Sequence, residues 1–315
     1  MEICNVTLPK VIKKKNNPLI SIIVPVKRVD TRPKMLETCV SSIFTNAEDP
    51  YGIELFIGLD EFDEVTLKYV RESIPEHIRK YHIVVFWRPP SDNFIQNFYE
   101  SGYRMSKGDL IWCLGEDVEI LTKNYDTIIK KRIQDRGEKC VMPYIIVGGR
   151  FINGLPDGRN QYCNFPLISR NFKHHDTFLP TTIPSWGVDA YFDGVFKWIA
   201  FIGKNQTLDL REEIKLHHRS HHFGDFEKDE LYELQEKRGN GQEEIAVSVE
   251  MHKTISYFYN LFFTGQQPPT TTRYSILTTE SPQGIGLCNI PQFSLTDENK
   301  KYVHEVDPSS GMAIS

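Results

Sequence analysis

The segment that decides the fold reads Gly108-Asp109-Leu110-Ile111-Trp112-Cys113-Leu114-Gly115-Glu116-Asp117. Five apolar residues run into a glycine and two acids, a pattern typical of a buried strand that delivers carboxylates to a cleft. Adjacent carboxylates beyond the carboxyl end of a strand suit a divalent cation and, through it, a diphosphate. The same pattern also fits a strand that runs into an acidic surface turn, so the rest of the chain has to decide between the two interpretations.

Three similar apolar runs precede this segment, at residues 19–26, 53–59 and 82–87. Helical spacing follows each of them, near residues 33–43, 65–73 and 91–106. This alternation predicts an α/β fold with a doubly wound, mostly parallel, Rossmann-like sheet and right-handed crossovers. Ligands bind such sheets beyond the carboxyl ends of the strands, where Pro25, Asp60 and Glu116-Asp117 would all lie.

The secondary-structure pattern of the second half of the sequence is mixed. We expect strands at 140–147 and 214–216, a Gly, Asn and Asp rich loop at 148–164, and helices near 125–135, 184–198, 226–238 and 243–263. Beyond residue 265 no periodicity is visible. The expected organisation is a polar lead-in (1–17), one main domain (18–225), and a C-terminal helical extension with an irregular tail (226–315).

Composition limits the classes of function. The 315 residues include 37 basic and 42 acidic side chains, and the net charge of -5 predicts no nucleic-acid partner. No apolar run approaches the roughly 20 residues that a membrane span needs, and the N-terminus lacks the apolar core of a secretory signal. We therefore expect a soluble, cytoplasmic protein. Its six cysteines are scattered without a CxxC pair, which indicates buried thiols rather than disulfides or a zinc site.

Three acids near expected strand ends are candidates for binding. Asp117 is the expected ligand of Mn²⁺ or Mg²⁺, an ion that stabilises a departing diphosphate. Glu116 is expected to accept hydrogen bonds from a ribose. Asp60 ends a strand of a parallel sheet, where an acid accepts a hydrogen bond from a nucleobase or a ribose hydroxyl. A helix cap is the alternative interpretation of Asp60.

A fourth acid, Asp189, follows Trp186 and Gly187 at an expected helix start. A carboxylate there is placed to take a proton from an acceptor hydroxyl, with the tryptophan as an apolar platform for a sugar ring. The alternative is an acid that merely stabilises the N-terminus of the helix.

A histidine cluster, His217-His218-Arg219-Ser220-His221-His222, follows the strand expected at 214–216. Imidazole is a good ligand for a transition metal. Alternation along the strand places Leu216 and His218 on one face, so His218 is the preferred ligand and His221 the second choice. A structural role for most of the four histidines is the alternative.

Taken together, these motifs resemble the family 2 glycosyltransferases on a GT-A fold. Residues 20–25 and 54–60 resemble the first two strands of that family, with its base-binding aspartate at Asp60. The segment Leu114-Gly115-Glu116-Asp117 stands where the family has its DxD motif, and Trp186-Gly187-Val188-Asp189 resembles its acceptor motif. Gly115 replaces the first DxD acid, and Val188 replaces the glutamate that usually precedes the catalytic aspartate.

The resemblance implies a metal-dependent, inverting, hexosyltransferase-like enzyme that moves a sugar from a nucleoside diphosphate sugar to a hydroxyl acceptor, expected to be a glycan. Asp189 would be the base and Trp186 and Gly187 would contact the acceptor. The donor would be held by Pro25, Val26, Asp60, Glu116 and Asp117, and the metal by Asp117, His218 and His221. The alternatives are a non-catalytic nucleotide-sugar-binding module, which the missing acids favour, and a sugar nucleotidyltransferase, which needs a glycine in the phosphate loop that 26–29 lacks.

Overall fold

The computed structural model describes residues 19–26, 35–60, 63–88, 95–136, 142–144, 151–152, 155–156, 165–170, 172, 180, 191–192, 194–195, 207–219, 250–251 and 253–255. The first half alternates strands with helical segments: β1 (Ile20–Pro25), α1 (Met35–Thr45), η2 (Pro50–Gly52), β2 (Ile53–Asp60), α2 (Glu64–Ser73), β3 (His82–Arg88), η3 (Ile95–Glu100), α3 (Ser101–Met105) and β4 (Leu110–Cys113). Each of the four apolar runs expected to be a strand is one.

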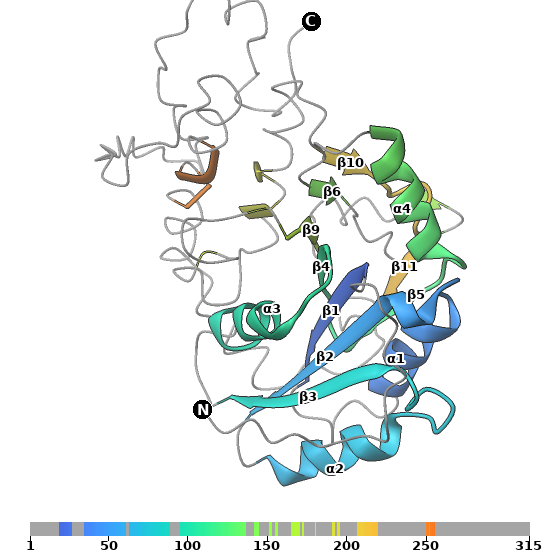
Figure 1. Cartoon of the computed structure of the whole chain (residues 1–315), viewed down its shortest axis with the longest axis vertical. Helices are drawn as coiled ribbons and strands as arrows, with labels where there is room; N and C mark the ends of the chain where they lie inside the picture. Colours follow the sequence, from blue (N-terminus) through green and yellow to red (C-terminus); the bar gives the residue numbers. More distant parts are fainter. Residues whose placement is uncertain are drawn as a thin grey trace, which may run out of the picture.

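These four strands form the centre of a five-stranded sheet with the order β3-β2-β1-β4-β9, where β9 is Leu167–Ser169 (Figure 1). The pairs β3·β2, β2·β1 and β1·β4 are parallel, and β9 joins β4 antiparallel. The α/β class and the mostly parallel sheet that the sequence predicted are therefore confirmed.

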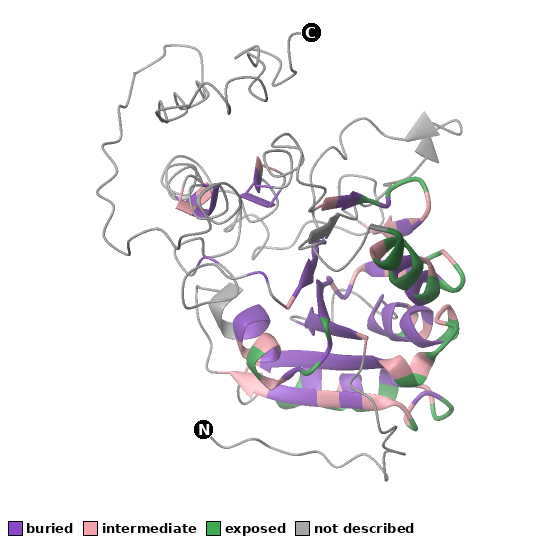
Figure 2. Cartoon of the chain, turned by 45° about the horizontal axis from the view of Figure 1, so that its top comes forward, coloured by how far each residue is buried: buried purple, intermediate pink, exposed green. Residues whose placement is uncertain are grey.

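Helices cover both faces of the sheet, with α1 and α3 on opposite sides (Figure 1). Ile22 and Val24 of β1 belong to a buried cluster with residues of α1 and α2. Ile23, which points the other way, lies directly against Gly102 of α3, where a side chain larger than hydrogen would collide with it. The inner strands are buried throughout, as Figure 2 shows, because both of their faces are covered.

Within the described residues, β9 and seven other elements follow β4: β5 (Val118–Ile120), α4 (Tyr125–Arg136), β6 (Met142–Tyr144), β7 (Phe151–Ile152), β8 (Leu155–Pro156), β10 (Thr207–Asp209) and β11 (Leu216–His218). Two-stranded pairings join β10 to β6, β11 to β5 and β7 to β8. The sequence did not predict β5, β9 or β10, and it predicted a loop where β7 and β8 pair. Strands of two or three residues carry too little apolar pattern to be recognised, and their pairing partners decide their structure.

Several expected elements are wholly or partly outside the described residues. The helix expected at 226–238, the lead-in and the tail are outside them, while 191–192, 194–195, 250–251 and 253–255 are helical, as expected. The division into a main domain and an extension therefore stays a prediction.

Among the helices that the structure describes, none combines the length and the hydropathy that a bilayer crossing requires.

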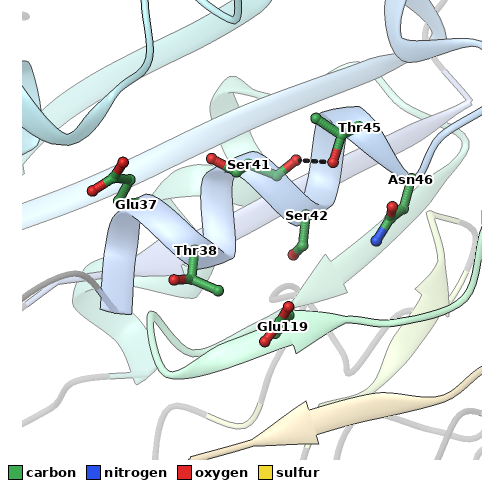
Figure 3. A pocket seen from close by; sticks show the side chains of 7 residues that line it. All are labelled: Glu37, Thr38, Ser41, Ser42, Thr45, Asn46 and Glu119. Atoms are coloured by element: carbon green, nitrogen blue, oxygen red, sulfur yellow. Dashed lines mark hydrogen bonds between the residues drawn. The ribbon is translucent and has the colours of Figure 1, made fainter.

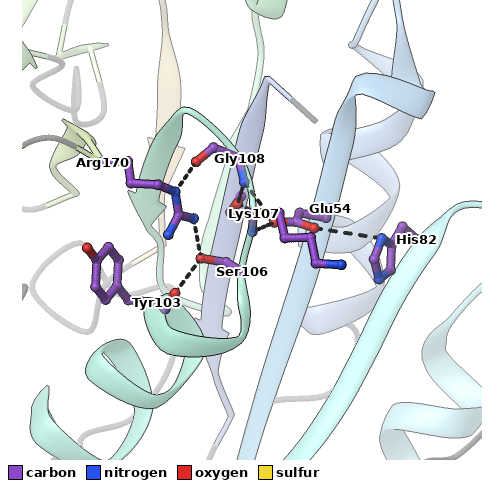
Figure 4. A network of polar contacts seen from close by, with 8 residues as sticks. Glu54, His82, Tyr103, Ser106, Lys107, Gly108 and Arg170 are labelled. Atoms are coloured by element: carbon purple, nitrogen blue, oxygen red, sulfur yellow. Dashed lines mark hydrogen bonds and ion pairs between the residues drawn. The ribbon is translucent and has the colours of Figure 1, made fainter. Parts of the chain in front are cut away.

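A buried carboxylate organises the amino edge of the sheet (Figure 4). Glu54 of β2 is only 1% exposed. Its Oε1 atom accepts hydrogen bonds from Ser21 Oγ at 2.5 Å and from the backbone N–H groups of Lys107 at 2.5 Å and Gly108 at 3.0 Å. His82 of β3 lies on the other side, with Nδ1 3.7 Å from Glu54 Oε2. One side chain thus connects β1, β2, β3 and the turn that precedes β4.

Arg170 holds the same turn from the opposite direction. Its Nε donates to the carbonyl oxygen of Gly108 at 2.5 Å and its Nη2 to Ser106 Oγ at 2.7 Å, while its guanidinium lies 5.1 Å from the centre of the Tyr103 ring. Gly108 is packed so closely against Ser21 that a Cβ atom would lie 2.6 Å from the backbone nitrogen of that residue. The start of β4 is therefore fixed on both sides.

Replacing Glu54 with alanine should lower the free energy of unfolding by about 3 kcal/mol, because buried N–H and O–H donors lose their acceptor. Urea unfolding followed by circular dichroism measures this loss. The matched control is Glu72→Ala on α2, whose side chain is 67% exposed and 3.9 Å from Lys68; it should cost less than about 1 kcal/mol. Equal losses for the two variants would contradict the role of Glu54.

Candidate functional site

The parallel register places several of the expected donor-binding residues at one edge of the sheet. Pro25 pairs with Gly58, and Asp60 lies two residues further along β2, opposite Arg88. Val26 follows Pro25, is buried, and donates its N–H to the carbonyl oxygen of Gly58 at 2.9 Å. On the other side of β1, Ile23 pairs with Cys113, so the segment after β4 leaves the sheet at this same edge.

The backbone of the acidic turn 114–117 is fixed by residues from several elements. Leu114 donates its N–H to the carbonyl oxygen of Ile23 at 3.0 Å and accepts a hydrogen bond from the Tyr99 hydroxyl at 3.1 Å. The carbonyl oxygen of Gly115 accepts from Val118 N–H at 3.3 Å and from the Cys39 thiol at 3.6 Å. The turn is therefore held by β1, η3 and α1 rather than exposed as a loose surface loop.

Pairing of β5 with β11 brings His218 to this turn. His218 lies opposite Val118, and the N–H of Arg219 donates to the carbonyl oxygen of Asp117 at 2.9 Å. As a result, His218 Nε2 is 3.3 Å from Asp117 Oδ2, although the two residues are 101 positions apart in the sequence. The imidazole packs nearly perpendicular to the Phe165 ring, with a centroid distance of 4.9 Å and an interplanar angle of 87°, and this contact helps to orient it.

The neighbouring histidine has a different environment. His217 pairs with Glu119 in the β5·β11 ladder, and its Nδ1 is 3.9 Å from Glu119 Oε2. Arg219 also reaches Glu119, at 3.6 Å. Alternation along β11 therefore separates His217 from the Asp117 carboxylate and directs His218 toward it.

Glu119 also lines a groove of about 410 Å³ between α1 and β5 (Figure 3). Two polar side chains on this groove, one from α1 and one directly after it, hold β5: Ser42 Oγ accepts from Ile120 N–H at 3.0 Å, and Asn46 Nδ2 donates to the carbonyl oxygen of Ile120 at 2.5 Å. These polar side chains fix the strand that follows Asp117, and so they support the acidic turn.

Asp117 and His218 fit part of the coordination set of Mn²⁺ or a similar ion, because they offer a carboxylate oxygen and an imidazole nitrogen at one point. Glu116, the residue directly before Asp117 in the turn, is 6% exposed. Within the described residues no group of three or more His, Cys, Asp or Glu side chains could hold a metal. The remaining ligands of an ion would therefore come from substrate, from water or from residues outside the described part, which include the predicted ligand His221.

The predicted acceptor-binding and catalytic residues Trp186, Gly187 and Asp189 lie outside the described residues. The helical residues that follow them are described. Tyr191 is fully buried, and its hydroxyl forms a 2.8 Å hydrogen bond with the Thr254 hydroxyl. Thr254 thus contacts Tyr191, two positions after Asp189 in the sequence.

Arg88 is a candidate that the sequence reasoning missed. It ends β3 opposite Asp60, and its buried Nε atom has no hydrogen-bond partner among the described residues. A cation at the carboxyl edge is suited to a phosphate group. The signal in the sequence was a lone arginine at the end of an apolar run, directly before Pro89-Pro90.

No protein-family model and no curated protein matches the chain by sequence. Solved structures similar to it include residues 1–349 of S. aureus TarS (13% identity, TM-score 0.49, covering 78% of this chain and 72% of that one) and the Pyrobaculum calidifontis mannosyltransferase PcManGT in complex with GDP-Man and Mn²⁺ (12%, 0.47, 81% and 67%). A third is GalNAc-T7 with UDP, GalNAc and Mn²⁺ (16%, 0.43, 65% and 44%). Membership of the family 2 glycosyltransferases stays a prediction at these values.

The buried thiols next to the acidic turn should be unreactive. Burial raises the pKa of Cys39 and of Cys113 above the ordinary value of 9.0, and for Cys39 the charges of Asp117, Glu116 and Glu119 raise it further. At pH 8 iodoacetamide should leave both thiols unmodified in the native chain and label both in guanidinium, as peptide mass spectrometry would show. Labelling of the native chain at the denatured rate would contradict their burial.

The raised pKa values of Cys39 and Cys113 also predict how these thiols affect the free energy of unfolding as the pH changes. The pKa of these thiols is higher in the folded chain than in the unfolded chain. Their contribution to the free energy of unfolding is therefore fully present below about pH 9 and is lost as the pH rises further. Replacing Cys39 with alanine should make the free energy of unfolding fall less steeply above pH 9. An unchanged slope in that variant would contradict the pKa shift of Cys39.

Proposed function

We propose that the chain is a metal-dependent glycosyltransferase that moves a sugar from a nucleoside diphosphate sugar to a hydroxyl acceptor, expected to be a glycan. One observation carries the proposal: strand register and the β5·β11 pairing gather Pro25, Asp60 and the Asp117–His218 pair at the carboxyl edge of one parallel sheet. That edge is where parallel α/β sheets bind nucleotides.

The donor nucleotide would lie along the ends of β1, β2 and β4. Pro25 and Val26 would contact the base, Asp60 would accept a hydrogen bond from the base or the ribose, and Glu116 would accept one from the ribose. Arg88, opposite Asp60, adds a cation that suits a phosphate oxygen. All five positions lie at or just beyond the ends of strands whose register is fixed by the core, so the donor would meet a preformed surface.

Asp117 and His218, with His221 as a further candidate, would hold a Mn²⁺ or Mg²⁺ ion. When bound, such an ion supplies positive charge that stabilises the departing diphosphate. Asp117 is suited to this role because its backbone is fixed by β11 and its carboxylate already lies beside an imidazole.

The acceptor hydroxyl would lose its proton to the Asp189 carboxylate, and the oxygen would attack the anomeric carbon from the face opposite the diphosphate. The bond to the diphosphate oxygen breaks as the new glycosidic bond forms, so the configuration inverts. Trp186 and Gly187 would contact the acceptor. This part of the proposal rests on the sequence resemblance alone.

The solved structures that resemble the chain include TarS in complex with UDP and the mannosyltransferase PcManGT in complex with GDP-Man and Mn²⁺. A non-catalytic nucleotide-sugar-binding module is the second candidate. The absence of an acid at position 115, and of the glutamate at 188, favours it. The two candidates share the donor site and differ in whether Asp189 performs chemistry.

Asp117→Asn should abolish stabilisation of the chain by Mn²⁺ with UDP or GDP sugars. A ligand at about 100 times its dissociation constant adds roughly 2.7 kcal/mol, so the thermal midpoint of the wild-type chain should rise by several degrees. The control is Glu72→Gln, on the exposed side of α2, which should keep the full shift. An undiminished shift in Asp117→Asn would exclude Asp117 as the metal ligand.

Asp189→Asn separates the two candidate functions. For the enzyme, transfer or donor hydrolysis should fall by roughly 10²- to 10⁴-fold, because a general base is lost, while donor binding stays unchanged. Product formation with Mn²⁺ and a panel of nucleotide sugars measures the rate. A wild-type chain that binds a donor and neither transfers nor hydrolyses its sugar would identify a binding module.

A further inference from the structure

Gly115 occupies the position of the first acid in the DxD pattern, and its own backbone does not require glycine. Its φ angle is outside the left-handed range from +20° to +160°, so an L side chain is sterically compatible with the backbone. The reason for glycine at this position must therefore be a neighbouring group.

That neighbour is the carboxylate of Asp117. A Cβ atom at position 115 would overlap Asp117 Oδ1, and its next contact would be Phe165 Cε1 at 3.3 Å. The aspartate thus folds back over Gly115 and occupies the space that a side chain there would take. Its other oxygen, Oδ2, is the one that lies 3.3 Å from His218 Nε2.

The backbone cannot easily move to relieve such an overlap. Hydrogen bonds from Leu114 to β1, from Tyr99 to Leu114, and from Val118 and Cys39 to Gly115 hold the turn on several sides. The backbone of Asp117 is tied to Arg219, and the His218 ring packs against Phe165. The atom that an added Cβ would displace is therefore Asp117 Oδ1, and it belongs to the same carboxylate whose Oδ2 lies beside His218.

We propose, resting on the metal site of the proposed function, that Gly115 is a positioning residue: the missing side chain lets the Asp117 carboxylate fold back into place beside His218 for cation binding. The departure from DxD is then part of a different ligand arrangement. Restoring the absent acid with Gly115→Asp weakens cation binding in this chain instead of strengthening it.

The test measures Mn²⁺ binding directly, by electron paramagnetic resonance titration of Mn²⁺ in the presence of UDP and, separately, of GDP. Gly115→Asp and Gly115→Ala should each bind Mn²⁺ at least about tenfold more weakly than the wild-type chain, the size of effect seen when the groups that orient a ligand are disturbed. The matched control is Gly52→Ala, where the added Cβ meets only ordinary contacts, the nearest at 3.5 Å from Asp49 Oδ2. It should bind as the wild type does.

A second readout does not involve the metal. Gly115→Ala should lower the thermal midpoint clearly in the wild-type chain and much less in an Asp117→Ala background, because the overlapping carboxylate is gone and only the 3.3 Å contact with Phe165 remains. This comparison decides the proposal if Gly115→Asp fails to fold. Equal effects in the two backgrounds would overturn it.

The binding outcomes distinguish this proposal from the proposed function. If the wild-type chain binds Mn²⁺ and Gly115→Asp binds it as tightly or more tightly, the role of Gly115 is wrong and the metal site remains. If the wild-type chain binds no Mn²⁺ with either nucleotide, both the metal site and the role of Gly115 are wrong.

Discussion

The buried carboxylate of Glu54 is the interaction on which the rest of the structure depends. A charge removed from water is tolerated only when hydrogen bonds replace its hydration, and here two backbone N–H groups and a serine hydroxyl do so. Because those N–H groups belong to Lys107 and Gly108, satisfying the charge also fixes where β4 begins. A shift of one residue would turn every side chain of β4 to the opposite face. This contact at the amino edge therefore also determines which residues follow β4 at the carboxyl edge.

The two edges of the sheet use polar residues differently. At the amino edge, Glu54 and Arg170 bind backbone and side-chain groups of the chain itself, and their effect is structural. At the carboxyl edge, Asp117 and His218 adjoin each other with side chains 18% and 21% exposed. Their backbones are fixed by β11 and their side chains can still be reached. Ligand binding needs this combination of fixed position and access.

The sequence predicted the parallel core because its four strands are long apolar runs, and burial on both faces leaves a strong signal. It did not predict β5 or β9, whose three residues each gain their structure from β11 and β4. Alternation along β11 places His218 beside Asp117 and His217 beside Glu119, and the role of His218 as a metal ligand stays a prediction. The fold-back of Asp117 over Gly115 was beyond prediction, because it depends on the rotamer of one side chain. Where Asp189 lies relative to this site stays a prediction.

The contact between Asp117 and His218 has a consequence for folding. It joins residues 101 positions apart, and any ion shared by the two side chains would act as a removable crosslink that closes this long segment into a loop. The entropy of closing a loop grows only with the logarithm of its length, so inserted residues between the two positions would be tolerated at small cost. Loops within this section could therefore differ in length while Asp117 and His218 stay side by side.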